Sequence, residues 1–568
     1  MRINLIGNHR TGTGVSHDVR ILHGLVAHVL GDTAQIRHVP HYYPQCPQAE
    51  VNLFVEVFNP SLLACAGKNI WVPNPEWTYK SWEPYAKMVD EIWVKTREAE
   101  KLFAQWVDPE RIRYVGWTSI DKVLPDKKNY WKAIVPVGKN IWRNPRPIIQ
   151  TYMAIKRSDP NLYAALPELN IVYDPQAIQL PPIPEEFQPK VKLHETLSEA
   201  EYDALLHECG LCICLSAAEG FGHAVNEAMS AGCLLLLNPI EAFRELADDV
   251  LWTSTHKTTP NPNCLGVLED VDLESIRDAL LVYVSSQFSW KRTKTALVRS
   301  EYEGRHASFV ARMTETLTNL FRDLPTYSLE DRLPKEDTLP AVSVVTITKD
   351  RRAFIPLAKY CFLAQAYPED KLEWVIVDDG TDQIKDLVSD LPNVTYVLCE
   401  RPMTIGEKRN LAVERAKHDV LVMLDDDDVY PNNSVVSRVA SMLAQPAKDC
   451  GFCTTIPCYD IHETKSFMNV PPMTLPMSER VSEATLCFTR AFWEERKFAE
   501  VQIAEGNAFV RGREQRCREM SPQDVIVSLT HKSTTSDRKA PAGDPNGCHY
   551  GFVDELFTLV SEIGQAIA

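Results

Sequence analysis

Four consecutive carboxylates, Asp425 to Asp428, come directly after the apolar run 420–424. A short apolar run with β-branched residues predicts a buried strand. Because burying an ionised carboxylate among apolar groups is costly, we expect the four acids to emerge at the carboxyl end of that strand. Open α/β sheets bind ligands at this edge, and a divalent cation relieves repulsion between adjacent carboxylates. The alternative is an acidic turn that is simply solvated.

A second acid pair has the same placement. Asp378 and Asp379 directly follow the apolar run 374–377 and are followed by a glycine. A carboxylate there can bind a ribose or a nucleobase, and the glycine permits a tight turn. The segment 406–416 predicts a helix between the two acid clusters, and it carries Arg409. We therefore expect both clusters and Arg409 at one edge of one sheet.

In the N-terminal half, Glu219 and Glu227 are eight residues apart, between two apolar runs that predict strands. Gly220 and Gly222 allow backbone amides to approach a ligand closely. A helix predicted to begin near His223 directs its N-terminus to the same place, which favours a diphosphate. The carboxylates can accept hydrogen bonds from vicinal sugar hydroxyls. The alternatives are capping or surface acids, and a histidine that packs structurally.

The order of predicted elements divides the chain. Apolar strands alternate with helical patterns twice before residue 321, which predicts two parallel α/β lobes, about 1–125 and 126–321. Residues 322–340 contain prolines and many charges with little apolar periodicity, and we interpret them as a linker. A new α/β pattern then begins, so 341–568 is the last predicted domain.

Composition limits the partners and the compartment. The 568 residues carry a net charge of −17, which disfavours nucleic-acid binding. No apolar stretch reaches the ~20 residues that span a bilayer, so we expect no transmembrane segment. The N-terminus lacks the long apolar core of a signal peptide, and the 15 cysteines are scattered as in proteins of reducing compartments. We expect a cytoplasmic protein, at most peripheral to a membrane.

The segment around Glu219 and Glu227 resembles the Glu-x7-Glu motif of retaining GT-B glycosyltransferases of the family 4-like group. This resemblance implies that Glu219 holds hydroxyls of the donor sugar and that Glu227 holds the nucleotide ribose. Lys139 and Arg143 are the nearest matches to the basic residues that bind the diphosphate in that group, although their spacing differs from the usual one.

The same resemblance concerns the other side of the cleft. The loop with Gly12 and Gly14 resembles an acceptor-side loop, from which His17 or Asp18 would reach the cleft. Both residues also fit an ordinary helix N-terminus. The segment 71–77 resembles a loop that faces the cleft.

Residues of about 341–535 resemble the GT-A fold of family 2 glycosyltransferases. The resemblance places Asp378 or Asp379 near the uracil and ribose, and Arg409 near the diphosphate. The family's Asp-x-Asp-Asp pattern matches the four aspartates. It implies that Asp425 contacts ribose or metal, that Asp426 belongs to the nucleotide-sugar site, and that Asp427 ligates Mn²⁺ or Mg²⁺.

Family 2 enzymes invert the anomeric centre in one displacement, which requires one general base. The base of the family lies in an acidic pair. Here Glu505 matches the first acid, while Gly506 replaces the second, so Glu505 is the predicted base and Asp524 the next candidate. His531 ends a predicted strand and resembles a late histidine that reaches the metal or the diphosphate; a simple strand-end histidine is the alternative.

The sequence therefore predicts a bifunctional glycosyltransferase of the α/β class, with a GT-B half followed by a GT-A half. Its expected donors are UDP- or GDP-sugars and its acceptor is a glycan. The N-terminal site would be retaining and metal-independent, and the C-terminal site inverting and dependent on Mn²⁺ or Mg²⁺. One alternative is a non-catalytic, carbohydrate-binding GT-B-like half. A nucleotidyltransferase is another, for which the glycine-rich triphosphate signature is missing.

Overall fold

The computed structural model describes residues 1–8, 14–41, 46–180, 182–322, 324–325, 334–444, 447–532, 534 and 552–567. Gly12 and much of the predicted linker, residues 323 and 326–333, lie outside the described residues. The domain bounds therefore stay predictions.

The first lobe is built on a six-stranded parallel sheet in the order β2-β1-β3-β4-β5-β6. Its strands are β1 (Arg2–Ile6), β2 (Gln35–Val39), β3 (Ala49–Val55), β4 (Ala66–Val72), β5 (Glu91–Val94) and β6 (Ile112–Tyr114). Every residue of β3 is buried, as expected for a central strand that is covered on both faces. The main helices of this lobe are α1 (Gly14–Leu30) and α3 (Arg97–Phe103).

The second lobe repeats this architecture in the order β12-β11-β10-β7-β8-β9. Its strands are β7 (Asn129–Gly138), β8 (Glu168–Tyr173), β9 (Val191–Glu195), β10 (Cys209–Cys214), β11 (Leu234–Leu237) and β12 (Val250–Trp252). Its helices are α4 (Arg146–Ser158), α5 (Pro160–Ala165), α6 (Glu199–Glu208), α7 (His223–Ser230), α8 (Glu241–Leu246) and α9 (Leu273–Ser285). The loop between β10 and α7 carries Glu219.

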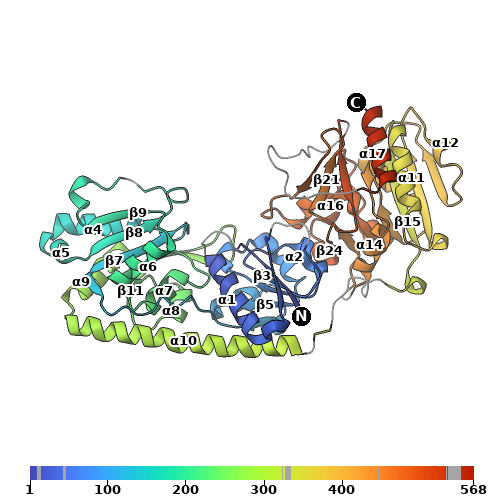
Figure 1. Cartoon of the computed structure of the whole chain (residues 1–568). Helices are drawn as coiled ribbons and strands as arrows, with labels where there is room; N and C mark the ends of the chain where they lie inside the picture. The colour runs from blue at the N-terminus through green and yellow to red at the C-terminus, as the bar shows by residue number, and fades with distance from the viewer. Residues whose placement is uncertain are drawn as a thin grey trace.

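One long helix, α10 (Phe288–Arg322), runs beneath both lobes (Figure 1). Tyr302 donates its hydroxyl to the carbonyl of Ser119 at 3.0 Å. Farther along α10, Phe309 packs edge-to-face on Trp117 with ring centroids 5.3 Å apart. The helix thus covers apolar surface that the two sheets leave open.

The C-terminal part contains a seven-stranded sheet in the order β17-β16-β15-β18-β23-β20-β24. Its strands are β15 (Val342–Thr348), β16 (Leu372–Asp378), β17 (Val394–Leu398), β18 (Val420–Met423), β20 (Cys450–Phe452), β23 (Cys487–Thr489) and β24 (Cys517–Glu519). A smaller sheet joins β19 (Asp428–Val429), β25 (Val527–Thr530), β21 (Ile456–Asp460) and β22 (Lys465–Asn469). The helices that carry site residues are α13 (Ile405–Arg415), α14 (Ser434–Leu443) and α16 (Glu505–Val510).

This architecture confirms the predicted fold class: two Rossmann-like lobes followed by a further α/β domain. In that domain the first three strands along the chain, β15, β16 and β17, are parallel neighbours, and β18 pairs with β15 on its other side. The carboxyl ends of β16 and β18 therefore meet at one edge, as the two acid clusters require.

The C-terminal domain packs against the first lobe (Figure 1). The indole Nε1 of Trp82 donates to the carbonyl of Met473 at 2.7 Å, and Ser81 Oγ donates to the carbonyl of Thr474 at 3.1 Å. The guanidinium of Arg480 lies 4.8 Å from the ring centroid of Tyr85. These contacts join the predicted GT-B and GT-A halves directly.

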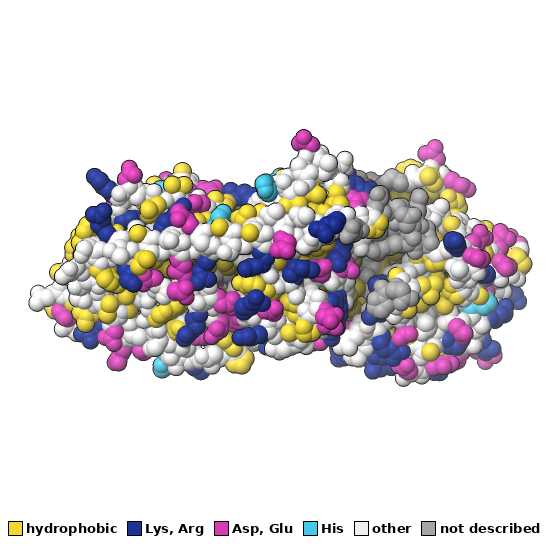
Figure 2. All heavy atoms as spheres, turned by 90° about the horizontal axis from the view of Figure 1, so that it is seen from below, with side chains coloured by type: hydrophobic (Ala, Val, Ile, Leu, Met, Phe, Trp, Pro, Cys, Tyr) yellow, Lys and Arg dark blue, Asp and Glu magenta, His cyan; other side chains and the backbone are white. Residues whose placement is uncertain are grey.

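On the face that carries α10, basic and acidic side chains are interspersed among the described residues (Figure 2). Of the helices in the described part of the chain, none combines the length and the apolar character that a membrane span requires.

Candidate active sites

A cavity of about 670 Å³ lies between the two N-terminal lobes. This volume is in the range of pockets that bind small molecules. The first lobe contributes His17, Glu56 and Glu76, and the second contributes Glu219 and Glu227. The cavity therefore brings together both acids of the Glu-x7-Glu segment.

Glu219 is held by basic and amide groups of its own lobe. Arg143 donates from Nε to Glu219 Oε1 at 2.5 Å and from Nη2 to Oε2 at 3.0 Å, and Asn140 donates to Oε1 at 3.2 Å. Burial lowers the pKa of Arg143, but attraction by Glu219 outweighs burial and keeps that pKa above its ordinary value. Arg143 thus orients Glu219, whereas Lys139 has a largely exposed side chain at the cavity wall, 3.7 Å from Asp174.

The glycines of this loop are required by close contacts. A Cβ on Gly220 would lie 2.8 Å from Asn74 Oδ1, and one on Gly222 would lie 2.8 Å from a ring carbon of Phe243. Gly222 also has a φ of 96°, which disfavours other residues, and it precedes the first turn of α7. The helix N-terminus reaches the cavity wall as predicted.

Two histidine–carboxylate pairs connect the lobes across the cleft. His17 Nδ1 lies 3.1 Å from Glu227 Oε1, and His223 Nε2 lies 2.7 Å from Asp18 Oδ1. The other ring nitrogen of His223 lies 2.9 Å from Ser119 Oγ. Both of its nitrogens are therefore engaged with protein groups, which favours the structural interpretation of His223.

Asp18 is fully buried and does not line the cavity. It accepts hydrogen bonds from Lys95 and from the Trp117 indole. Burial raises the pKa of Asp18, but Lys95 and His223 outweigh burial and lower it to about 2. Of the two predicted acceptor-side residues, only His17 faces the cleft.

Two further acids face the cavity from the first lobe. Glu76 is 6% exposed, and its Oε2 has no hydrogen-bond partner among the described residues. Burial, together with repulsion from Glu219 and Glu56, raises the pKa of Glu76 to about 8. Glu56 has a φ of 63° and accepts a hydrogen bond from Asn74 at 2.6 Å. The sequence predicts that segment 71–77 faces the cleft, but it does not single out Glu56 or Glu76 as cavity-lining acids.

In the C-terminal domain, Asp378 and Asp379 shape the loop after β16. Asp378 is fully buried and accepts hydrogen bonds from the Gly380 amide at 2.8 Å and the Tyr396 hydroxyl at 2.7 Å. Asp379 accepts from Lys408 at 2.8 Å. Both acids are therefore committed to protein partners.

The four aspartates separate into different environments. Asp425 accepts from Arg409 at 3.1 Å and 3.3 Å. Arg351 donates to Asp426 at 2.9 Å and to Asp427 at 2.5 Å, and His531 Nε2 lies 3.1 Å from Asp427 Oδ2. Asp428 belongs to β19 and accepts the Leu529 amide at 2.9 Å, so it joins the small sheet.

Asp427 and His531 have donor atoms that fit Mn²⁺ or Mg²⁺. Carboxylate oxygen and imidazole nitrogen are both ligand types for such metals, and Asp427 Oδ2 and His531 Nε2 lie 3.1 Å apart. Asp426 Oδ2 is a buried oxygen without a hydrogen-bond partner among the described residues. Asp425 is turned toward Arg409, and the described residues contain no group of three or more acidic, histidine or cysteine side chains with metal-site spacing.

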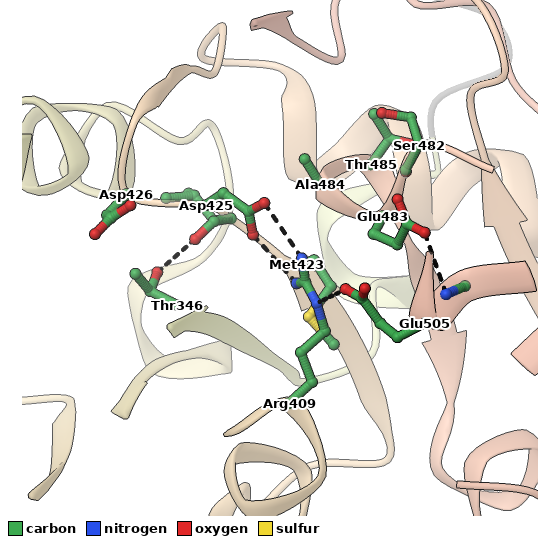
Figure 3. Close-up of polar contacts among 12 residues, drawn as sticks. Thr346, Arg409, Met423, Asp425, Asp426, Ser482, Glu483, Ala484, Thr485 and Glu505 are labelled. Atoms are coloured by element: carbon green, nitrogen blue, oxygen red, sulfur yellow. Dashed lines mark hydrogen bonds and ion pairs between the residues drawn. The ribbon is translucent and has the colours of Figure 1, made fainter. Parts of the chain in front are cut away.

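Arg409 joins Asp425 to Glu505 (Figure 3). Its Nε donates to Glu505 Oε1 at 2.7 Å, and both side chains are 4% exposed. A second acid, Glu483, lies beside Glu505 and accepts the Gly506 amide at 3.2 Å. Burial and repulsion from Glu505 raise the pKa of Glu483 to about 7.

Residues 343–493 match the family model described as Glycosyl transferase family 2. The chain carries a family 2 glycosyltransferase domain. This match confirms the predicted family of the C-terminal half.

A curated relative from Xanthomonas oryzae pv. oryzae (strain PXO99A), a GDP-mannose:cellobiosyl-diphosphopolyprenol alpha-mannosyltransferase, is 34% identical over 110 residues. The matched segment spans 18% of this chain and 29% of that relative. Among solved structures, the mannosyltransferase PcManGT from Pyrobaculum calidifontis, in complex with GDP-Man and Mn²⁺, is 20% identical. That match covers 35% of this chain and 60% of PcManGT, with a TM-score of 0.29. TarM is 12% identical, over 48% of this chain and 54% of TarM, with a TM-score of 0.33.

The sequence alone did not identify Arg351 or Glu483 in the family 2 domain. Arg351 follows β15, whose carboxyl end lies at the same edge as the acids, and this position was the available signal. Asp524, the second candidate base, has a φ of 63° and lies before β25, and burial raises its pKa.

Proposed function

We propose that the chain is a bifunctional glycosyltransferase that adds two sugars from nucleotide-diphospho-sugars during glycan assembly. The proposed halves are residues 1–321 and 341–568, joined by the linker 322–340. The observation that carries the proposal is that the acid-lined cavity between the lobes and the strand-edge acids of the family 2 domain are separate sites.

The N-terminal site is proposed to transfer with retention and without metal. Glu219, oriented by Arg143, accepts hydrogen bonds from hydroxyls of the donor sugar. Glu227 accepts hydrogen bonds from the ribose hydroxyls after the side chain of His17 has moved away from it. The start of α7 and Lys139 face the diphosphate, for which oriented amides and a cation are suited.

The C-terminal site is proposed to invert the configuration of the anomeric carbon. Asp427 and His531 would hold Mn²⁺ or Mg²⁺, which supplies Lewis-acid stabilisation of the departing diphosphate. Asp425, held by Arg409, faces the ribose, and Asp378 and Asp379 shape the nucleotide loop. A single displacement also requires a carboxylate to accept the acceptor proton, and Glu505 and Glu483 are adjacent candidates.

GDP-mannose and UDP-sugars are the first donors to test, with oligosaccharide and lipid-linked glycans as acceptors. The choice of GDP-mannose and of a lipid-linked acceptor follows the activity of the Xanthomonas relative. Strand-end acids bind the ribose of either nucleotide equally well, so the base is left to the donor screen.

The experiment is a donor screen of the full-length chain and two single-site variants, reading released UDP or GDP with and without EDTA. Glu219→Gln should leave only activity that EDTA abolishes. Asp427→Asn should leave only activity that EDTA does not affect. In Glu219→Gln only the C-terminal site remains active. Turnover by this variant that resists EDTA would therefore contradict the metal assignment.

One observation favours a second candidate function, in which the N-terminal half only binds carbohydrate. Both acids of its motif already have partners, Arg143 for Glu219 and His17 for Glu227. In that case Asp427→Asn abolishes all turnover, while the variant still binds glycan in calorimetry.

A further inference from the structure

Gly506 occupies the position where the family 2 pattern has its second acid, and the structure shows what fills the space beside it. A Cβ on Gly506 would lie 2.9 Å from Cγ and Oε1 of Glu483 and 2.9 Å from Cγ1 of Val481. The Gly506 amide also donates to that Oε1 at 3.2 Å. The side chain of Glu483 reaches this point from a different segment of the chain. Together with Val481 it occupies the volume that a side chain at position 506 would need, and it is the acid of the two.

Glu505, the first acid, is poorly placed to accept a proton. Its side chain is 4% exposed, and its Oε1 accepts from Arg409 Nε at 2.7 Å. The carboxylate oxygen that accepts from Arg409 already has a hydrogen-bond partner, and burial leaves little room for an acceptor hydroxyl to approach Glu505. Glu483 has no ion-pair partner among the described residues, and as a whole residue it is less completely buried than Glu505.

We propose that Glu483 is the general base of the C-terminal site and that Glu505 is a positioning residue for Arg409. The inference rests on the proposed function of that site. The acceptor hydroxyl oxygen forms a bond to the anomeric carbon of the donor, and its proton moves to the Glu483 carboxylate. The bond from that carbon to the diphosphate oxygen breaks, and its electron pair leaves with the nucleoside diphosphate.

The ionisation of Glu483 agrees with this role. The charged groups that face it are Glu505 of α16 and Arg409 of α13, and its pKa of about 7 places it near neutral pH. A base whose pKa is near the working pH transfers protons efficiently. Because the base must be ionised, kcat/KM of the C-terminal site should fall about tenfold per pH unit below about pH 7.

The first test is Glu483→Gln in the full-length chain, with the EDTA-sensitive release of nucleoside diphosphate as the readout. Removal of a general base lowers the rate by about 10²–10⁴-fold, and we expect this loss in kcat with donor affinity unchanged. Glu479→Gln removes a nearby surface acid and should leave the rate unchanged. Unchanged melting temperatures would separate chemistry from folding.

Glu505→Gln distinguishes the two roles of the acids. If Glu483 is the base, the variant keeps measurable transfer, and its acid limb moves to lower pH because a repelling charge beside Glu483 is gone. If Glu505 is the base, the same variant is inactive at every pH, and the proposal is overturned.

A rescue experiment tests the spatial substitution directly. Glu483→Ala removes the Glu483 atoms beside Gly506, so that only the Val481 methyl must shift, and adding Gly506→Asp returns a carboxylate there. The EDTA-sensitive rate of the double variant should be at least tenfold higher than that of Glu483→Ala alone. Wild-type transfer with no EDTA-sensitive component would refute the proposed function itself, whereas wild-type rates in Glu483→Gln would refute only this assignment.

Discussion

At the scale of single residues, Glu76 shows a carboxyl group held in a costly environment. Its pKa of about 8 lies above its ordinary value of 4.5 because it is buried beside other acids. Below pH 4.5 it is protonated in the folded and unfolded chain alike. Between 4.5 and about 8 only the unfolded chain releases the proton, so the residue destabilises the fold increasingly as pH rises.

Glu76→Gln should therefore raise the free energy of unfolding at pH 7 by about 1–3 kcal/mol. The gain should vanish at pH 4, where the wild-type residue is neutral in both states. Urea unfolding at the two pH values measures it, and Glu110→Gln, an exposed acid of the same lobe, is the control. An equal gain at both pH values would contradict the assigned ionisation. A simultaneous loss of EDTA-resistant transfer would indicate that the cleft needs this acid.

The sequence could predict residues whose role follows from a local pattern. Asp427 and His531 were expected at one site and lie 3.1 Å apart, because each follows a strand whose end is recognisable. Arg351 and Glu483 could not be predicted in the same way. Their roles depend on contacts with Asp426 and Gly506, 75 and 23 residues away in the sequence, and no local pattern encodes these contacts.

At the scale of elements, helix α14 supports the end of strand β18. Arg438 of α14 is fully buried and donates to the Met423 carbonyl at 2.6 Å and to the Ser434 hydroxyl at 2.9 Å. Met423 ends β18, two residues before Asp425. The guanidinium thus fixes the strand end that presents the acids.

Arg438→Lys should lower the free energy of unfolding by about 1–3 kcal/mol, because an ammonium group cannot reproduce the forked hydrogen bonds and leaves buried acceptors unsatisfied. EDTA-sensitive transfer should fall about tenfold or more, because small misplacements of site residues are costly. EDTA-resistant transfer should not change. Arg511→Lys, at a largely exposed arginine of the same domain, is the matched control. Equal losses at both sites would show a general folding defect instead.

Elements that are buried on both faces were predictable as apolar runs, and β3, β10 and β15 are of this kind. Strands β2 and β9 were missed. They are edge strands with a single buried residue each, so their sequences contain polar residues and lack an apolar run. Their pairing comes from the neighbouring strand rather than from their own pattern.

At the scale of the whole molecule, the contact between the first lobe and the family 2 domain depends on Trp82. Trp82→Phe keeps an aromatic ring but removes the hydrogen bond to the Met473 carbonyl. We expect a stability loss of about 1–3 kcal/mol and a larger radius of gyration in small-angle scattering. Trp106→Phe, in the same lobe, should leave the radius unchanged. An unchanged radius in Trp82→Phe would show that the remaining contacts suffice for docking.

Helix α10 has a consequence for the order in which the chain acquires structure during synthesis. The first lobe leaves Trp117 to be covered by Phe309, a residue that is made nearly 200 positions later. A nascent chain that has completed only the first lobe would expose this apolar surface, which attracts chaperones or other nascent chains. The N-terminal half is therefore expected to complete its folding only after α10 leaves the ribosome, while the family 2 domain is still being translated.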